Sequence, residues 1–206
     1  MFSLKICGVT TRADALELAR LGVPALGVNF WEPSKRHCPP ETARTFLPEL
    51  AGKILRVGVF VNNSRPLAST LYNEGLLDVI QLHGDESPAD MAFFLSEKIP
   101  TIRALPAGPN LATRLGTPLP DALLLDTPAG KNYGGTGQTF DWSQAIAAET
   151  QFPNLPLLLA GGLTPENAAQ ALQSVHPTGL DIASGAERSP GRKDFDKVRK
   201  LIEITS

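Results

Sequence analysis

Short apolar runs alternate with segments of helical periodicity eight times along the chain, and this alternation restricts the fold more than any other feature of the sequence. Eight strands are predicted, at Leu4–Cys7, Ala25–Phe30, Ile54–Phe60, Asp78–Leu82, Thr101–Ala104, Ala122–Leu125, Leu157–Ala160 and Gly179–Ile182. Alternation of this kind produces a parallel sheet covered by helices. Open doubly wound sheets usually stop at about five or six strands, whereas eight units in 206 residues suit a small barrel. We therefore predict the α/β class and a TIM (β/α)8 barrel that forms a single domain over residues 1–206.

The helix signals between the strands are of ordinary strength. The clearest helices are predicted over residues 11–21, 165–174 and 194–204. Thr164 is expected to cap the second of these, with Pro165 at its first helical position. The fifth helix, within residues 106–118, is expected to have only one or two turns.

Charge and hydropathy exclude two classes of partner. Nineteen Lys and Arg residues stand against 21 Asp and Glu residues, and no long run of either sign occurs, so nucleic acid is not expected as a partner. The longest apolar runs, at 122–125 and 157–159, are far shorter than the roughly 20 residues of a membrane span. The first ten residues lack the apolar core of a signal peptide, so we expect a cytoplasmic protein.

The cysteines and histidines give no sign of a metal or of a disulfide framework. Cys7 and Cys38 are 31 residues apart, outside any CxxC or Cys/His ligand pattern. The three histidines share no ligand spacing either. We therefore expect no metal site.

A TIM barrel places its active site at the carboxyl ends of its strands. The residues that close the predicted strands form a polar set: Cys7, Asn29, His83, Arg103, Asp126, Gly161, Gly162, Asp181, Ser184 and Gly185. Each of these residues has a purely structural alternative, because a barrel rim tolerates polar side chains.

Two glycine-containing loops predict a phosphate site. Gly161 and Gly162 follow the seventh strand, and Ser184 and Gly185 follow the eighth, just before a segment, 189–194, that could open a short helix. Glycine lets backbone N–H groups turn toward an anion, and TIM barrels commonly bind phosphate with these two loops. The alternative is that the glycines only form tight turns.

Asp126 and Cys7 are the candidates for proton transfer. Asp126 follows four apolar residues, and a carboxyl group at such a strand end can act as a general acid, although it could also cap a loop or helix. Cys7 lies two residues after Lys5 on the same strand face, so Lys5 could lower the thiol pKa. The alternative for Cys7 is an inert buried cysteine. The glycine-rich stretch 131–137 is interpreted as a lid over a ligand.

Eight segments together resemble the phosphoribosylanthranilate isomerase family of tryptophan biosynthesis, and the resemblance runs from end to end. These segments are KICGVT at 5–10, NFWEPSKR at 29–36, RVGVFVN at 56–62, QLHGDE at 81–86, LLLDT at 123–127, GGTGQTFDW at 134–142, LAGGLTPENA at 159–168 and LDIASGAE at 180–187. The order of KICG, QLHGDE and GGTG before FDW is the most specific part, because many phosphate-binding barrels share the glycine pair.

The resemblance implies an Amadori rearrangement of N-(5'-phosphoribosyl)anthranilate, catalysed without a metal or an organic cofactor. Asp126 would protonate the furanose oxygen, and Cys7 would remove the C2' proton. Arg36 would hold the anthranilate carboxylate, and Asp181 would lie near the anthranilate amino group. His83, in the QLHGDE segment, belongs to the implied substrate-binding set.

The implied phosphate site consists of Gly161, Gly162, Ser184 and Gly185. The sequence departs from the family pattern at two places, one in the phosphate loop and one directly after Arg36. Ala183 stands where the family often has a first serine, and His37 with Cys38 follows Arg36 where an aromatic or aliphatic residue is usual.

Two rival functions are weighed against this one. Another phosphosugar enzyme would keep the phosphate loops with different chemistry, and a non-catalytic barrel could lose Cys7 or Asp126. The expected partner is a small phosphosugar–anthranilate molecule, and the expected assembly is a monomer or homodimer.

Overall fold

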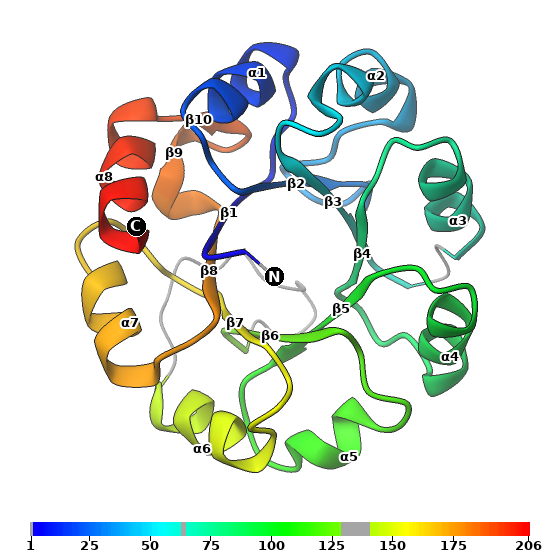
Figure 1. Cartoon of the computed structure of the whole chain (residues 1–206), viewed down its shortest axis with the longest axis vertical. Helices are drawn as coiled ribbons and strands as arrows, with labels where there is room; N and C mark the ends of the chain where they lie inside the picture. The colour runs from blue at the N-terminus through cyan, green and yellow to red at the C-terminus, as the bar shows by residue number, and fades with distance from the viewer. Residues whose placement is uncertain (1, 63–64, 129–140) are drawn as a thin grey trace.

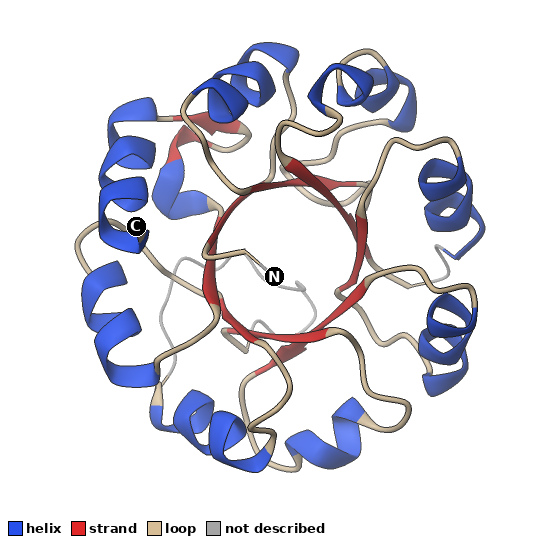
Figure 2. Ribbon diagram, in the orientation of Figure 1, coloured by secondary structure: helices blue, strands red, loops and turns tan. Residues whose placement is uncertain are grey.

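Eight parallel strands close into a barrel in chain order, and helices surround it (Figures 1 and 2). This computed structural model describes residues 2–62, 65–128 and 141–206. The strands are β1 (Leu4–Cys7), β2 (Ala25–Asn29), β3 (Leu55–Phe60), β4 (Val79–Leu82), β5 (Thr101–Pro106), β6 (Ala122–Asp126), β7 (Leu157–Leu159) and β8 (Gly179–Ile182). The predicted TIM barrel is therefore confirmed, and six of the eight strands differ from their predicted bounds by one or two residues at one end.

The helices follow the strands in alternation. They are α1 (Arg12–Arg20), α2 (Pro40–Arg44), α3 (Arg65–Asn73), α4 (Pro88–Ser96), α5 (Leu111–Leu115), α6 (Ser143–Gln151), α7 (Ala168–Val175) and α8 (Phe195–Thr205), with short 3₁₀ helices η1 (Leu47–Leu50) and η3 (Ser184–Ala186). The fifth helix is short, as predicted. None of the helices within the described ranges is long and apolar enough to cross a bilayer.

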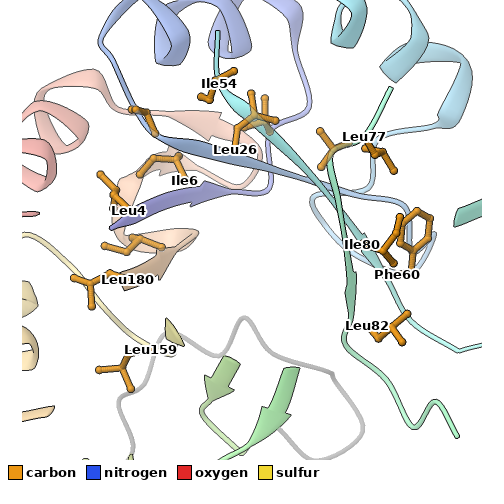
Figure 3. Packing of buried hydrophobic residues seen from close by; sticks show 14 of the residues in the cluster. Leu4, Ile6, Leu26, Ile54, Phe60, Leu77, Ile80, Leu82, Leu159 and Leu180 are labelled. Atoms are coloured by element: carbon orange, nitrogen blue, oxygen red, sulfur yellow. The ribbon is translucent and has the colours of Figure 1, made fainter. Parts of the chain in front are cut away.

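Alternation along each strand divides the apolar side chains into two layers. Residues such as Val57, Leu124 and Leu158 fill the barrel interior. Their strand neighbours pack in a larger layer that also contains helix residues such as Leu18 and Val198. Figure 3 shows members of this second layer that lie on the strands or just before them. Because adjacent residues face opposite layers, the polar residues Lys5 and Gln81 point into the barrel.

Two local predictions are wrong. Helix α7 begins at Ala168 rather than at Pro165, because Thr164 and Asn167 close a turn in which the Thr164 N–H donates to Asn167 Oδ1 at 2.8 Å. Residues 189–193 form no separate short helix, and Asp194 caps α8. Ser189, Arg192 and Lys193 belong to an antiparallel pair, β9 (Glu187–Ser189) and β10 (Arg192–Lys193), whose connection uses Gly191 at φ +75°.

Candidate functional site

A cavity of about 440 Å³ lies at the carboxyl ends of the strands. Most of the predicted site residues line it: Cys7, Asn29, Arg36, His83, Asp126, Gly161, Gly162, Asp181 and Ser184. Gly185 does not belong to this lining among the described residues. Arg103 is also turned elsewhere, because its guanidinium forms an ion pair with Glu86.

Lys5 occupies the barrel interior beneath this cavity and is fully buried. Its ammonium group donates to Asp181 Oδ2 at 2.9 Å, to Gln81 Oε1 at 2.8 Å and to Cys7 Sγ at 3.4 Å. Gly27 on β2 makes room for it, since a Cβ there would lie 2.8 Å from Lys5 Cε and 2.7 Å from Cys7 Sγ. The predicted proximity of Lys5 and Cys7 is therefore confirmed.

Lys5 lowers the pKa of the Cys7 thiol, as predicted, but the net shift of that pKa is upward, so the predicted lowering of the Cys7 pKa is wrong. Burial raises the pKa of the Cys7 thiol and the Asp181 carboxylate raises it further, while Lys5 and Lys193 offset this only in part. Burial alone would lower the pKa of Lys5, but Asp181 and Cys7 outweigh it and hold that pKa above its ordinary value. Lys5 therefore stays cationic, and Cys7 is mainly a thiol at neutral pH in the ligand-free protein.

We expect the Cys7 thiol to titrate above the ordinary value of about 8.5. In a Cys38→Ser background, the ultraviolet absorbance of the thiolate reports Cys7 alone. Adding Asp181→Asn should lower the midpoint, because the thiolate then becomes the nearest counter-charge of Lys5. The control is Asp196→Asn, whose side chain is exposed on α8. An unchanged or higher midpoint in the Asp181 variant would contradict this electrostatic account.

Asp126 is the last residue of β6 and is nearly buried. Its Oδ1 accepts from the Thr127 N–H at 2.7 Å, and its Oδ2 lies 3.3 Å from His83 Nε2. The strand continues to this residue because its carbonyl accepts from the Ala107 N–H at 2.8 Å. The carboxyl group thus faces the cavity beside His83 and caps no helix in the described part of the chain.

Arg36 reaches the cavity from the loop after β2. Glu187 orients its guanidinium, with contacts to Nε at 2.9 and 3.0 Å and to Nη2 at 2.7 Å. Lys193 also donates to Glu187, at 2.8 Å. The loop itself is fixed by Asn29, whose carbonyl accepts from the Cys38 N–H at 2.8 Å and whose side chain contacts Ser34 at 3.2 Å. These contacts present a preorganised cation to a ligand.

The loops after β7 and β8 lie side by side. Gly161 and Gly162 adopt φ values of +84° and +62°, which favour glycine. Their N–H groups have no hydrogen-bond partner among the described residues, so they are available to an anion. Gly185 packs behind the loop, where a Cβ would lie 1.9 Å from the Leu163 carbonyl oxygen. A glycine at this position therefore allows the two loops to pack closely against each other.

Asp181 carries an unused acceptor. Its Oδ2 accepts from Lys5, whereas its buried Oδ1 has no hydrogen-bond partner in the described part of the chain. Asp181 also lines the cavity. A buried oxygen of this kind requires a donor, and a ligand N–H in the cavity would supply one.

Some predictions about the site have no structural outcome. The predicted lid at 131–137 lies outside the described residues. Within the described ranges, no three His, Cys, Asp or Glu side chains are grouped so that they could hold a metal ion.

Three buried polar residues of the site were not predicted: Gln81, Glu187 and Lys193. Gln81 precedes His83 by two residues, so strand alternation alone could have placed it on the inward face. Glu187 and Lys193 belong to the β9–β10 pair, and the wrong helix prediction for 189–194 concealed their role.

Comparisons with known proteins agree over the whole chain. A family model described as N-(5'phosphoribosyl)anthranilate (PRA) isomerase matches residues 4–204. N-(5'-phosphoribosyl)anthranilate isomerase of Citrifermentans bemidjiense is 41% identical over 202 residues, 98% of this chain and 96% of the relative. The crystal structure of phosphoribosyl anthranilate isomerase from Thermotoga maritima has a TM-score of 0.86 at 36% identity and covers 100% of this chain and 98% of its own. A structure of the isomerase in complex with reduced 1-(o-carboxyphenylamino)-1-deoxyribulose 5-phosphate has a TM-score of 0.84 at 34% identity, with the same coverage.

Proposed function

The chain belongs to the N-(5'-phosphoribosyl)anthranilate isomerase family, and we propose that it isomerises N-(5'-phosphoribosyl)anthranilate with Asp126 as general acid and Cys7 as general base. The product is 1-(2-carboxyphenylamino)-1-deoxyribulose 5-phosphate, in the biosynthesis of tryptophan. The observation that carries the assignment is the shared cavity: a carboxyl group, a thiol and an arginine line it together with two glycine loops.

The order of the strands supports this division of roles. Around the barrel, β7 and β8 separate β6, which carries Asp126, from β1, which carries Cys7. The proposed phosphate loops therefore lie between acid and base. A phosphosugar anchored there would present one part of its ribose to the carboxyl group and another to the thiol.

In the first step, Asp126 donates a proton to the furanose ring oxygen. The C1'–O bond breaks, and the nitrogen lone pair forms a cationic imine at C1'. The carboxylate that remains accepts from the Thr127 N–H and faces His83 Nε2, so the new negative charge is stabilised without rearrangement.

In the second step, the Cys7 thiolate removes the C2' proton, and the electrons move into the C1'–C2' bond to give an enolamine. The adjacent cationic imine makes that proton acidic. Ketonisation then moves the O2' proton and protonates C1', so the overall reaction is an isomerisation with no change in composition. Lys5 lies 3.4 Å from the sulfur and stabilises the thiolate when it forms.

The substrate's other groups match the remaining lining. Arg36 suits the anthranilate carboxylate, because a planar guanidinium pairs well with a planar anion. Asp181 Oδ1, which has no hydrogen-bond partner among the residues that the structure describes, would accept from the anthranilate N–H. Gly161, Gly162 and Ser184 would bind the phosphate, with Gly185 supporting the loop from behind.

The test is turnover of freshly made phosphoribosylanthranilate, followed by loss of its anthranilate-type fluorescence. A rate above the spontaneous decay of the substrate, with the ketose phosphate as product, is expected. A protein that binds the substrate without turnover would support the non-catalytic barrel instead. Turnover of a different phosphosugar alone would support the rival enzyme.

We expect Gly185→Ala to weaken substrate binding more than catalysis. The added methyl would press on the Leu163 carbonyl and move the two phosphate loops apart. Steady-state kinetics should show KM raised by about tenfold or more, which corresponds to the loss of one or two charge-assisted hydrogen bonds. The change in kcat should be smaller. Gly22→Ala is the control, since φ is +77° there but no atom lies within 4 Å of the new methyl. An unchanged KM would contradict the supporting role.

A further inference from the structure

Gln81 connects the surroundings of Cys7, the proposed base, to those of Asp126, the proposed acid. Gln81 itself does not line the cavity. It lies on β4 and is fully buried. Its Oε1 accepts from Lys5 Nζ at 2.8 Å, and its Nε2 lies 3.2 Å from His83 Nδ1. His83 Nε2 in turn lies 3.3 Å from Asp126 Oδ2. A continuous row of polar contacts therefore runs from Cys7 to Asp126 through the barrel.

Lys5 determines which way the Gln81 amide faces. An ammonium group has three donors and no acceptor. All three are directed at partners: Asp181, Cys7 and Gln81. The amide oxygen must therefore face Lys5, which leaves the NH₂ group to donate to His83 Nδ1.

A fixed amide also fixes the imidazole. Because Nδ1 accepts from Gln81, the proton of neutral His83 is on Nε2, which faces Asp126 Oδ2. In the opposite tautomer, an Nε2 lone pair would face the acid and compete with the substrate for its proton. In the Nε2–H form, the imidazole instead stabilises the carboxylate that ring opening leaves behind.

We propose that Gln81 is a positioning residue that holds neutral His83 as an Nε2–H donor to Asp126, so that the acid delivers its proton to the substrate and not to the imidazole. This inference rests on the proposed function for its effect on rate. Its effect on the tautomer is independent of turnover. The effect on the tautomer and the effect on the rate can therefore be disproved independently of each other.

The test is Gln81→Glu, which preserves shape and keeps an acceptor for Lys5. Its carboxylate can only accept, so neutral His83 must carry its proton on Nδ1 and turn the Nε2 lone pair toward Asp126. We expect ¹⁵N NMR, with the His83 resonance assigned by His83→Asn, to show the Nε2–H tautomer in the wild type and its loss in the variant. kcat should fall by about 10²-fold, the lower end of a general-acid contribution, with KM changed less than about threefold.

Controls separate this proposal from a general packing effect. Thr101→Val removes another buried hydrogen bond, from Thr101 Oγ1 to the Ile99 carbonyl at 2.8 Å, and should leave kcat unchanged. If Gln81→Glu does not fold, Gln81→Met replaces it, and a fall in kcat with KM preserved is expected again. Retention of the Nε2–H tautomer in Gln81→Glu, or an unchanged kcat in the variant that folds, would overturn the proposal. A wild type inactive on phosphoribosylanthranilate but showing the Nε2–H tautomer would overturn the proposed function instead.

Discussion

Asp126→Asn is expected to lower kcat by about 10² to 10⁴-fold, the range for a positioned general acid, while the enzyme still binds the reduced product analogue. The amide has the shape of the carboxyl group but no proton to donate to the ring oxygen. Its oxygen would accept from the Thr127 N–H, as Asp126 Oδ1 does at 2.7 Å, so the loop that follows should keep its position. Steady-state fluorescence measures the rate, and calorimetric titration measures analogue binding.

The matched control for that variant lies just before the same strand. Asp121 Oδ2 accepts from the Thr101 N–H at 2.8 Å, outside the cavity lining, so Asp121→Asn should change stability rather than turnover. Equal losses of analogue affinity and rate in Asp126→Asn would assign this residue to substrate binding and not to proton transfer.

Much of the fold could be predicted because the local signals agreed with the global topology. Both β1 and β8 have the predicted bounds, and β6 extends one residue further to Asp126 because its ladder with β5 continues to Pro106. The failures were at polar turns. At Thr164, a side-chain contact with Asn167 competed with helix capping, and the segment that contains Gly191 pairs its own ends.

The site could be predicted as a set of positions but not as a set of interactions. Strand ends indicated which residues meet, since parallel strands share one carboxyl edge. The electrostatics depended on register: Lys5 pairs with Asp181 across β1 and β8, although the two residues are 176 positions apart. Burial, together with that carboxylate, reverses the expected shift in the pKa of Cys7. Likewise, the contact between Lys5 and Gln81 follows only from closure of the barrel.

Cys7→Ser is expected to lower kcat by about 10² to 10⁴-fold, as for loss of a positioned base, whereas Cys38→Ser should leave it nearly unchanged. A serine hydroxyl can still accept from Lys5, so the buried network keeps its geometry, but it gives up its proton far less readily than a thiol. Cys7 already has a raised pKa, which means that Lys5 is needed to stabilise the small thiolate fraction. Serine has no comparable anionic form at working pH.

Cys38 is a good control because it is also a thiol and lies only two residues after Arg36 in the chain. It is fully buried in the apolar layer outside the barrel, and burial with the Glu41 charge raises its pKa to about 11. A hydroxyl there should lower the free energy of unfolding by about 1–2 kcal/mol, the cost of a buried polar group, without changing turnover. Thermal unfolding and kinetics measured on both variants separate the two effects. An active Cys7→Ser enzyme would remove the thiol from the mechanism but leave the barrel and the phosphate loops as described, because neither depends on that sulfur.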